Sequence, residues 1–265
     1  MSHYSLLVVG ENVDERLAPY QENNHGTVPD EYLEWKDKEG EYRENWEKGS
    51  VEVYEINDEY VLPWNAKNVD DDKELVEVSF KELFEDFKEF AKEWYNSEGE
   101  HGYYHNPNAK WDWYEIGGRW KDSLLVKENV ENVSKGDPGL GYKELEAPEE
   151  YKWVDQALVK DVEWDKMKEY SKKRSEELWE EAQEVDEDAR SFKYGITEDM
   201  TKEEYVNDYN DFTTFAILDE GWKEKGNMMM FGMVANEDES WPEQYQKYLD
   251  ELDDEEIITF VDCHI

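Results

Sequence analysis

The chain has 265 residues, of which 38% are hydrophobic and 15% aromatic, so it has enough apolar side chains to bury a core and is not a disordered polymer. Its 71 Asp and Glu outnumber its 29 Lys and Arg, and the resulting net charge of −42 disfavours direct binding to nucleic acid because phosphates would be repelled. The single cysteine excludes an intramolecular disulfide, and no apolar run reaches the ~20 residues of a membrane span, so we expect a cytoplasmic protein.

The first predicted elements are a strand and a helix. Residues 4–9 are apolar at successive positions, which predicts a strand buried on both faces. Residues 79–94 carry apolar side chains at spacings of three and four, with Ser79 as N-cap and Glu82 at the capping-box position. This pattern predicts an amphipathic helix whose aromatic stripe faces the core.

The second half of the chain alternates charged and apolar segments. Residues 160–189 have a loose helical period and predict a long, solvated helix. Residues 212–234 predict a hairpin that turns at 219–221, residues 240–252 predict a helix with Pro near its start, and residues 257–261 predict a last strand. This order predicts one α+β domain over 1–265, with helices mainly on one face of an antiparallel sheet, for which a ferredoxin-like arrangement is a candidate. Residues 121–210 are expected to form a charged, partly helical insertion.

The segment 105–120, HNPNAKWDWYEIGGRW, concentrates aromatic rings, two glycines and an arginine. As a ligand pocket, its rings would stack on a planar group, Arg119 would bind phosphate or carboxylate, and His105 or Asn106 would recognise polar edges. As a structural segment, Asn106 would open a turn, the indoles would seal a core, and Arg119 would bridge to a buried carboxylate such as Asp112. Both interpretations stay open. The candidate ligand-binding residues are His105, Asn106, Trp111, Asp112, Trp113, Tyr114, Gly117, Gly118, Arg119 and Trp120.

The two predicted terminal strands place His3 near Asp262, Cys263 and His264 if they pair antiparallel. These side chains are weak candidates for a zinc site or for a Cys–His nucleophile pair with Asp262 as its orienter. Successive strand residues point to opposite faces, so Cys263 would point away from its two neighbours. We therefore favour ordinary structural roles, predict no cofactor and keep zinc as the weak alternative.

Acidic runs at 70–72, 144–150, 184–188 and 250–256 are candidate interaction faces. A folded surface dense in carboxylates can imitate the charge of DNA, which carries about one negative charge per 1.7 Å of axis. The competing interpretation is that each run is a solvated surface that keeps the protein soluble.

Three blocks of the sequence resemble an uncharacterised protein family carried by bacteriophages and scattered bacterial genomes. They are MSHYSLLVVG followed by LAPYQENN, the central NPNAKWDWYEIGGRW, and the ending FVDCHI. The resemblance covers both ends and the centre of the chain but not residues 121–210. It implies cargo of a phage or mobile element acting in the host cytoplasm, and it carries no activity and no catalytic residue with it.

We therefore expect a binding protein rather than an enzyme. Its partner would be a basic host or anti-phage defence protein, which it would inhibit stoichiometrically through an acidic, nucleic-acid-mimicking surface. One alternative is a small-ligand binder that sequesters a nucleotide-type signal in the Trp and Arg pocket. Another is an enzyme that uses His3, Asp262 and His264.

Overall fold

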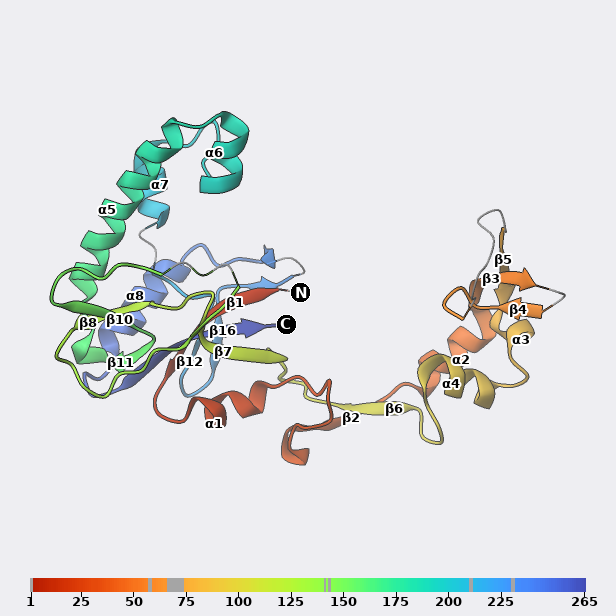
Figure 1. Cartoon of the computed structure of the whole chain (residues 1–265). Helices are drawn as coiled ribbons and strands as arrows, with labels where there is room; N and C mark the ends of the chain where they lie inside the picture. The colour runs from red at the N-terminus through yellow and green to blue at the C-terminus, as the bar shows by residue number, and fades with distance from the viewer. Residues whose placement is uncertain are drawn as a thin grey trace. The chain divides into compact units, whose positions relative to one another are not determined.

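The computed structural model describes residues 2–56, 59–65, 74–140, 142, 144–209, 212–229 and 232–265 (Figure 1). The contacts between Cα atoms divide the chain into two compact units. The terminal unit consists of Met1–Glu22 and Ala109–Ile265, and the 23–108 unit consists of Asn23–Asn108. The sequence predicts a single domain, whereas the chain leaves the terminal unit after residue 22 and re-enters it at residue 109.

The terminal unit is built on a mixed sheet in which the first and last strands lie side by side. β1 (His3–Val9) and β16 (Ile257–His264) pair antiparallel over their whole length, with His3 opposite His264. In spatial order, the sheet contains β13 (Trp222–Glu224), β12 (Ala216–Leu218), β1, β16, β7 (Trp113–Gly118) and β9 (Asp137–Pro138), and β11 (Gln156–Leu158) also pairs with β16. The α+β class and the pairing of the terminal strands are confirmed. Most strand pairs of this sheet are antiparallel, as expected, and the sheet is mixed because β1 pairs parallel with β12 and β7 pairs parallel with β9.

Both faces of this sheet are covered, as the apolar run at 4–9 predicts. On one face, Leu7 and Phe260 pack in a cluster that includes residues of α5 (Trp164–Gln183) and α8 (Trp241–Glu251). On the other face, Leu6 and its neighbours pack in a cluster with residues of α1 (Val13–Leu17). The central strands are thus held by burial on two sides, which is the dominant favourable term in folding.

The segment 121–210 has two structural roles. Its first part forms β8 (Leu124–Lys127) and β10 (Tyr151–Val154), which pair antiparallel and bury Leu124, Leu125, Trp153 and Val154 in the core of the terminal unit. Its second part is helical, with α5 followed by α6 (Glu187–Tyr194) and α7 (Lys202–Tyr209) around a small cluster of its own. The segment is therefore not a separate insertion, because β8 and β10 belong to the core, while the helices and most residues between β8 and β10 are exposed.

In its described residues, the 23–108 unit combines two small sheets with three α-helices. The first sheet pairs β2 (Glu34–Asp37) with β6 (Gly102–His105), and the second contains β4 (Glu59–Val61), β3 (Ser50–Ile56) and β5 (Leu75–Ser79). The helices are α2 (Glu39–Lys48), α3 (Phe80–Leu83) and α4 (Phe87–Tyr95). The capping box of Ser79 and Glu82 is confirmed, and Phe80 and Phe90 are buried as the aromatic stripe predicts. The single helix predicted over 79–94 is wrong, because Phe84 is extended and separates α3 from α4.

Other local predictions in the terminal unit are confirmed. β12 and β13 form the hairpin that turns at 219–221, and α8 begins with Pro242 in its first turn. A further short ladder pairs β14 (Asn227–Met228) with β15 (Val234–Ala235), and three short 3-10 helices are Ala18–Tyr20, Asp30–Tyr32 and Val159–Asp161. In the part of the chain that the structure describes, no helix is long and apolar enough to cross a membrane.

Candidate functional site

The paired terminal strands bring two histidines together at one end of the sheet. The His3 and His264 rings have their centroids 4.9 Å apart, and each ring is held by a carboxylate. The Nδ1 atom of His3 lies 2.7 Å from Oδ1 of Asp262, and the Nδ1 atom of His264 lies 2.5 Å from Oδ1 of Asp112. A carboxylate that accepts from Nδ1–H fixes the orientation and tautomer of an imidazole and leaves its Nε2 atom for proton transfer or ligand binding. We call His3, Asp112, Asp262 and His264 the histidine cluster.

Cys263 takes no part in the histidine cluster. Its side chain is fully buried in the opposite face of the sheet, where it packs with Tyr4 and Val261. Burial raises the pKa of the Cys263 thiol well above its ordinary value, so the thiolate is disfavoured. The predicted Cys–His nucleophile pair is therefore wrong, because successive side chains of β16 point to opposite faces and Cys263 points away from His264.

The same cluster was the weak candidate for zinc. Within the residues that the structure describes, no three His, Cys, Asp or Glu side chains are arranged to hold a metal ion. His3 and His264 are each bonded to a carboxylate through Nδ1, and a third protein ligand beside them is absent from this part of the chain.

The segment 111–116 divides its aromatic rings between two environments. Trp111 is buried and donates its indole N–H to the carbonyl of Leu17 at 3.0 Å. Tyr114 packs edge-on against Trp111, and its hydroxyl donates to the carboxylate of Asp14. Trp113 is 48% exposed and lies edge-on to His3, with ring centroids 6.1 Å apart. Trp111 and Tyr114 therefore serve the core, while Trp113 borders the histidine cluster.

The glycine pair lies between two buried carboxylates. Gly117 and Gly118 have φ values of 77° and 55°, in the left-handed region that favours glycine. A Cβ on Gly118 would lie 2.4 Å from the Cβ of Asp262, and one on Gly117 would lie 3.0 Å from Oδ2 of Asp155. Oδ2 of Asp262 accepts from the backbone N–H of Arg119 at 3.0 Å. The two glycines therefore permit close backbone packing that ties the motif to the histidine cluster.

Asp155 fixes the loop that follows the glycine pair. Its two carboxylate oxygens accept from the backbone N–H groups of Gly136 at 2.8 Å and Ser123 at 3.3 Å. Burial raises the pKa of Asp155, although the backbone hydrogen bonds oppose that rise. Its position is that of a structural carboxylate, which holds residues 117–123 against residues 134–136.

Asp112 is hydrogen-bonded to His264 and not to Arg119, and the bond of Arg119 to a buried carboxylate comes from its backbone N–H to Asp262, so the predicted side-chain bridge is wrong. The Arg119 side chain is exposed, and its guanidinium has no hydrogen bond or ion pair with any residue in the described ranges. Arg119 and Trp120 instead line a cavity of about 430 Å³ in the terminal unit. Its walls also contain the neighbouring Lys121 and, from distant parts of the chain, Arg174, Trp153 and Phe260.

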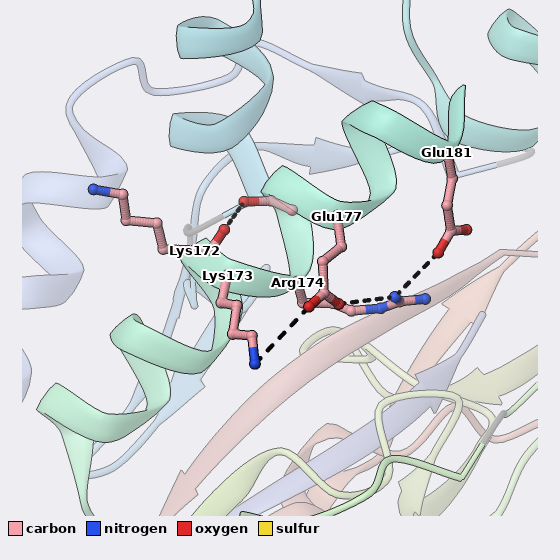
Figure 2. Close-up of polar contacts among 6 residues, drawn as sticks. Lys172, Lys173, Arg174, Glu177 and Glu181 are labelled. Carbon is pink, nitrogen blue, oxygen red and sulfur yellow. Dashed lines mark hydrogen bonds and ion pairs between the residues drawn. The ribbon is translucent and has the colours of Figure 1, made fainter. Parts of the chain in front are cut away.

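Arg174 reaches this cavity from α5, where it contacts two glutamates of its own helix (Figure 2). Its Nη1 atom lies 3.4 Å from Glu177 and 3.5 Å from Glu181, and the side chain is 38% exposed. Lys173 lies 4.0 Å from the other oxygen of Glu177. These long, solvent-exposed pairs are weak, because strong charge-assisted hydrogen bonds are about 2.7–2.9 Å long.

The ten predicted ligand-binding residues thus do not form a single site within the terminal unit. Only Arg119 and Trp120 line the cavity, and Asp112 and Trp113 lie at the histidine cluster. His105 and Asn106 belong to the 23–108 unit, where Oδ1 of Asn106 accepts from the N–H of Asn108 and forms the predicted turn. The sequence analysis missed the cavity wall formed by α5 and β10, since no local pattern links those residues to Arg119.

A surface of exposed aromatic rings was also missed. All four residues of β2 are exposed, and Trp35 stands opposite Tyr104 of β6 with ring centroids 5.1 Å apart. Trp35 is 41% exposed, Tyr103 is 46% exposed and Tyr104 is 59% exposed. Gly102 makes room for the indole, because a Cβ there would lie 2.6 Å from the Trp35 ring. We call these two paired strands the aromatic ribbon.

The acidic runs are exposed where the structure describes them. The carboxylates at 144–150, 184–188 and 250–255 are exposed, whereas the run at 70–72 lies outside the described residues. Asp186 has a structural role, because its side chain accepts from the N–H of Ala189 and caps α6. Neither a protein-family model, nor a curated protein, nor a solved structure matches this chain.

Proposed function

We propose that the protein acts by binding a basic protein partner stoichiometrically and thereby blocking it. The observation that carries the proposal is the aromatic ribbon, which exposes Trp35 and Tyr104 together on one face and Tyr103 on the other, on strands flanked by carboxylates. The resemblance to phage-borne proteins favours a host or defence protein as the partner. Carboxylates would accelerate the encounter with such a partner, and the rings would anchor the complex.

The ribbon suits an anchoring role because its rings are exposed yet held in place. Trp35 and Tyr104 contact each other at an edge-to-face angle of 66°, and Lys36 lies 5.9 Å from the centre of the Tyr103 ring. Trp and Tyr are enriched among residues that dominate binding energy at protein interfaces. A two-stranded ladder is marginally stable by itself in water, so a partner that covers its rings would also stabilise the ladder.

The charge of the 23–108 unit specifies the kind of partner. Its sequence holds 24 acidic and 9 basic side chains, and Glu34 and Asp37 are exposed on the ribbon itself. An acidic partner would meet like charge across the interface, which costs free energy and slows association. A basic surface, including one that normally binds DNA or RNA, is therefore the expected counterpart, and this is the sense in which the protein would imitate a nucleic acid.

The proposal is tested by quantitative capture from a lysate of phage-infected bacteria. Tagged wild-type protein is compared with the Trp35→Ala/Tyr104→Ala variant and with Phe192→Ala, which removes a ring that is 95% exposed in the terminal unit. We expect a basic protein to be retained by the wild type and by Phe192→Ala at low salt, and to be lost with the double variant. Size-exclusion chromatography with light scattering then measures the stoichiometry of the purified complex.

Two results would contradict the proposal. One is a partner that the double variant retains as well as the wild type does, since the ribbon would then have no anchoring role. The other is a set of retained proteins that are acidic or whose capture does not respond to salt, because charge complementarity would then not select the partner. Circular dichroism of both variants establishes that the fold is intact.

A further inference from the structure

We propose that the cavity lined by Arg119 and Trp120 binds a small anion that carries an aromatic ring, such as a nucleoside monophosphate. This site lies in the terminal unit, whereas the aromatic ribbon lies in the 23–108 unit. The inference is therefore independent of the proposed function, and either can fail without the other.

The charge of the cavity wall is opposite to that of the chain. Three cations, Arg119, Lys121 and Arg174, line the cavity, and Asp122 is the carboxylate among the described residues of the wall. Asp122 is buried and already satisfied in part, because Lys121 lies 3.6 Å away and the Tyr142 hydroxyl donates to it. In a chain of 71 acidic and 29 basic side chains, a wall of this composition favours an anionic ligand.

The guanidinium of Arg119 is placed to meet such an anion. The backbone of Arg119 is fixed by the hydrogen bond from its N–H to Asp262 and by the buried glycine pair before it. Its side chain, in contrast, has no bonded partner in the part of the chain that the structure describes. A planar guanidinium binds phosphate or carboxylate through two parallel hydrogen bonds, which gives both affinity and orientation.

The aromatic part of the wall specifies the rest of the ligand. Trp120, Trp153 and Phe260 come from the loop after β7, from β10 and from β16, and all three line the same cavity. Trp153 and Phe260 are buried core residues, so the apolar floor is part of the folded sheet. The volume of about 430 Å³ falls in the range of roughly 300–1,000 Å³ that small-molecule sites occupy. The expected ligand therefore has an anionic group that contacts the cations and a ring that packs against the indoles.

Isothermal titration of the full chain with AMP, adenosine and indole-3-acetate tests this inference. We expect AMP to bind, adenosine to bind at least about tenfold more weakly because it lacks the phosphate, and Arg119→Ala to weaken AMP binding at least about tenfold. If indole-3-acetate binds and AMP does not, the ligand is an aromatic carboxylate rather than a nucleotide. Arg43→Ala serves as the matched control, since Arg43 is an exposed arginine in the other unit.

A second measurement locates the binding. Indole N–H signals of Trp120 and Trp153, assigned through Trp→Phe variants, should shift when the binding anion is added and shift less with adenosine at equal concentration. The inference is overturned if neither anion binds, or if AMP binds equally well to wild type and Arg119→Ala. It is also overturned if the indole signals of the cavity do not move on binding.

Discussion

Because Gly118 has no side chain, the end of β7 can pack closely against Asp262 of β16. The residue has a φ of 55°, and a Cβ there would lie 2.4 Å from the Cβ of Asp262. We predict that Gly118→Ala destabilises the terminal unit by about 2–4 kcal/mol, because a left-handed conformation and a steric clash act together. Urea unfolding followed by tryptophan fluorescence measures this loss.

Gly195 provides the matched control for that substitution. It has a φ of 69° and lies in the same unit, but no heavy atom lies within 4 Å of the position of its Cβ. Gly195→Ala should therefore cost only about 1 kcal/mol, which is the conformational part alone. Equal losses for the two variants would mean that the contact with Asp262 does not restrict the residue at 118.

The interruption between α3 and α4 shows how a local signal ends and restarts a helix. Asp86 caps α4, since its carboxylate accepts from the N–H of Glu89 at 2.9 Å. We predict that Asp86→Ala destabilises the 23–108 unit by about 1 kcal/mol, the usual cost of losing an N-cap. Chemical denaturation followed by circular dichroism reports this change.

Asp86→Asn is the informative comparison, because asparagine keeps an oxygen acceptor at the cap. It should retain most of the stability, and Lys88→Ala, at an exposed position of the same helix, should change it by less than about 0.5 kcal/mol. If Asp86→Asn lost as much as Asp86→Ala, the carboxylate charge rather than the capping hydrogen bond would stabilise the start of α4.

Elements with strong local patterns could be predicted from the sequence, and contacts between distant segments could not. The terminal strands, the hairpin at 219–221 and the Ser79 capping box all rest on side chains a few residues apart. The break at Phe84 was missed although Asp86 and Glu89 have the spacing of a second cap. The parallel pairing of β1 with β12 has no local signal, because the two strands are separated by most of the chain.

The candidate site could likewise be predicted where it rests on local patterns, and not where it depends on contacts between distant segments. Antiparallel pairing of the ends correctly placed His3 opposite His264, and strand alternation correctly removed Cys263 from that cluster. The cavity wall could not be foreseen, because Arg174 enters from α5 and meets Arg119 only in the folded unit. Similarly, Trp35 and Tyr104 pair across strands that lie far apart in the sequence.

At the scale of the whole molecule, the net charge of −42 opposes the compact state through repulsion among carboxylates. Buried Asp155 and partly buried Glu115 add to this effect, since desolvation raises the pKa of both, and nearby Asp137 and Asp262 raise the pKa of Glu115 further. The folded state therefore binds protons more tightly than the unfolded state at these two positions. Their contribution to stability is greatest below their ordinary pKa and is lost as the pH rises through the folded pKa.

Two exposed carboxylates near helix starts, those of Glu82 and Glu204, change the free energy of unfolding in the opposite direction at lower pH. Hydrogen bonds from Ser79 lower the pKa of Glu82, and those from Thr201 lower the pKa of Glu204. Their contributions are present above the ordinary pKa of a glutamate, about 4.3, and are lost as the pH falls through the lowered values. Asp155 and Glu115 lose their contribution as the pH rises, and Glu82 and Glu204 lose theirs as the pH falls. The free energy of unfolding therefore has its maximum between these two pH ranges, on the acidic side of neutrality.

We predict that the free energy of unfolding rises as the pH falls from neutrality toward the ordinary pKa of carboxyl groups, about 4, and declines again below that pH. At pH 7, raising NaCl from about 0.05 to 0.5 M should stabilise the protein, because the Debye length shortens from over 10 Å to under 5 Å and screens the repulsion. Urea midpoints at each pH and salt concentration measure both effects. Midpoints that are unchanged by salt at pH 7 would mean that the folded carboxylates lie too far apart to repel one another, and the net charge would then have no part in setting stability.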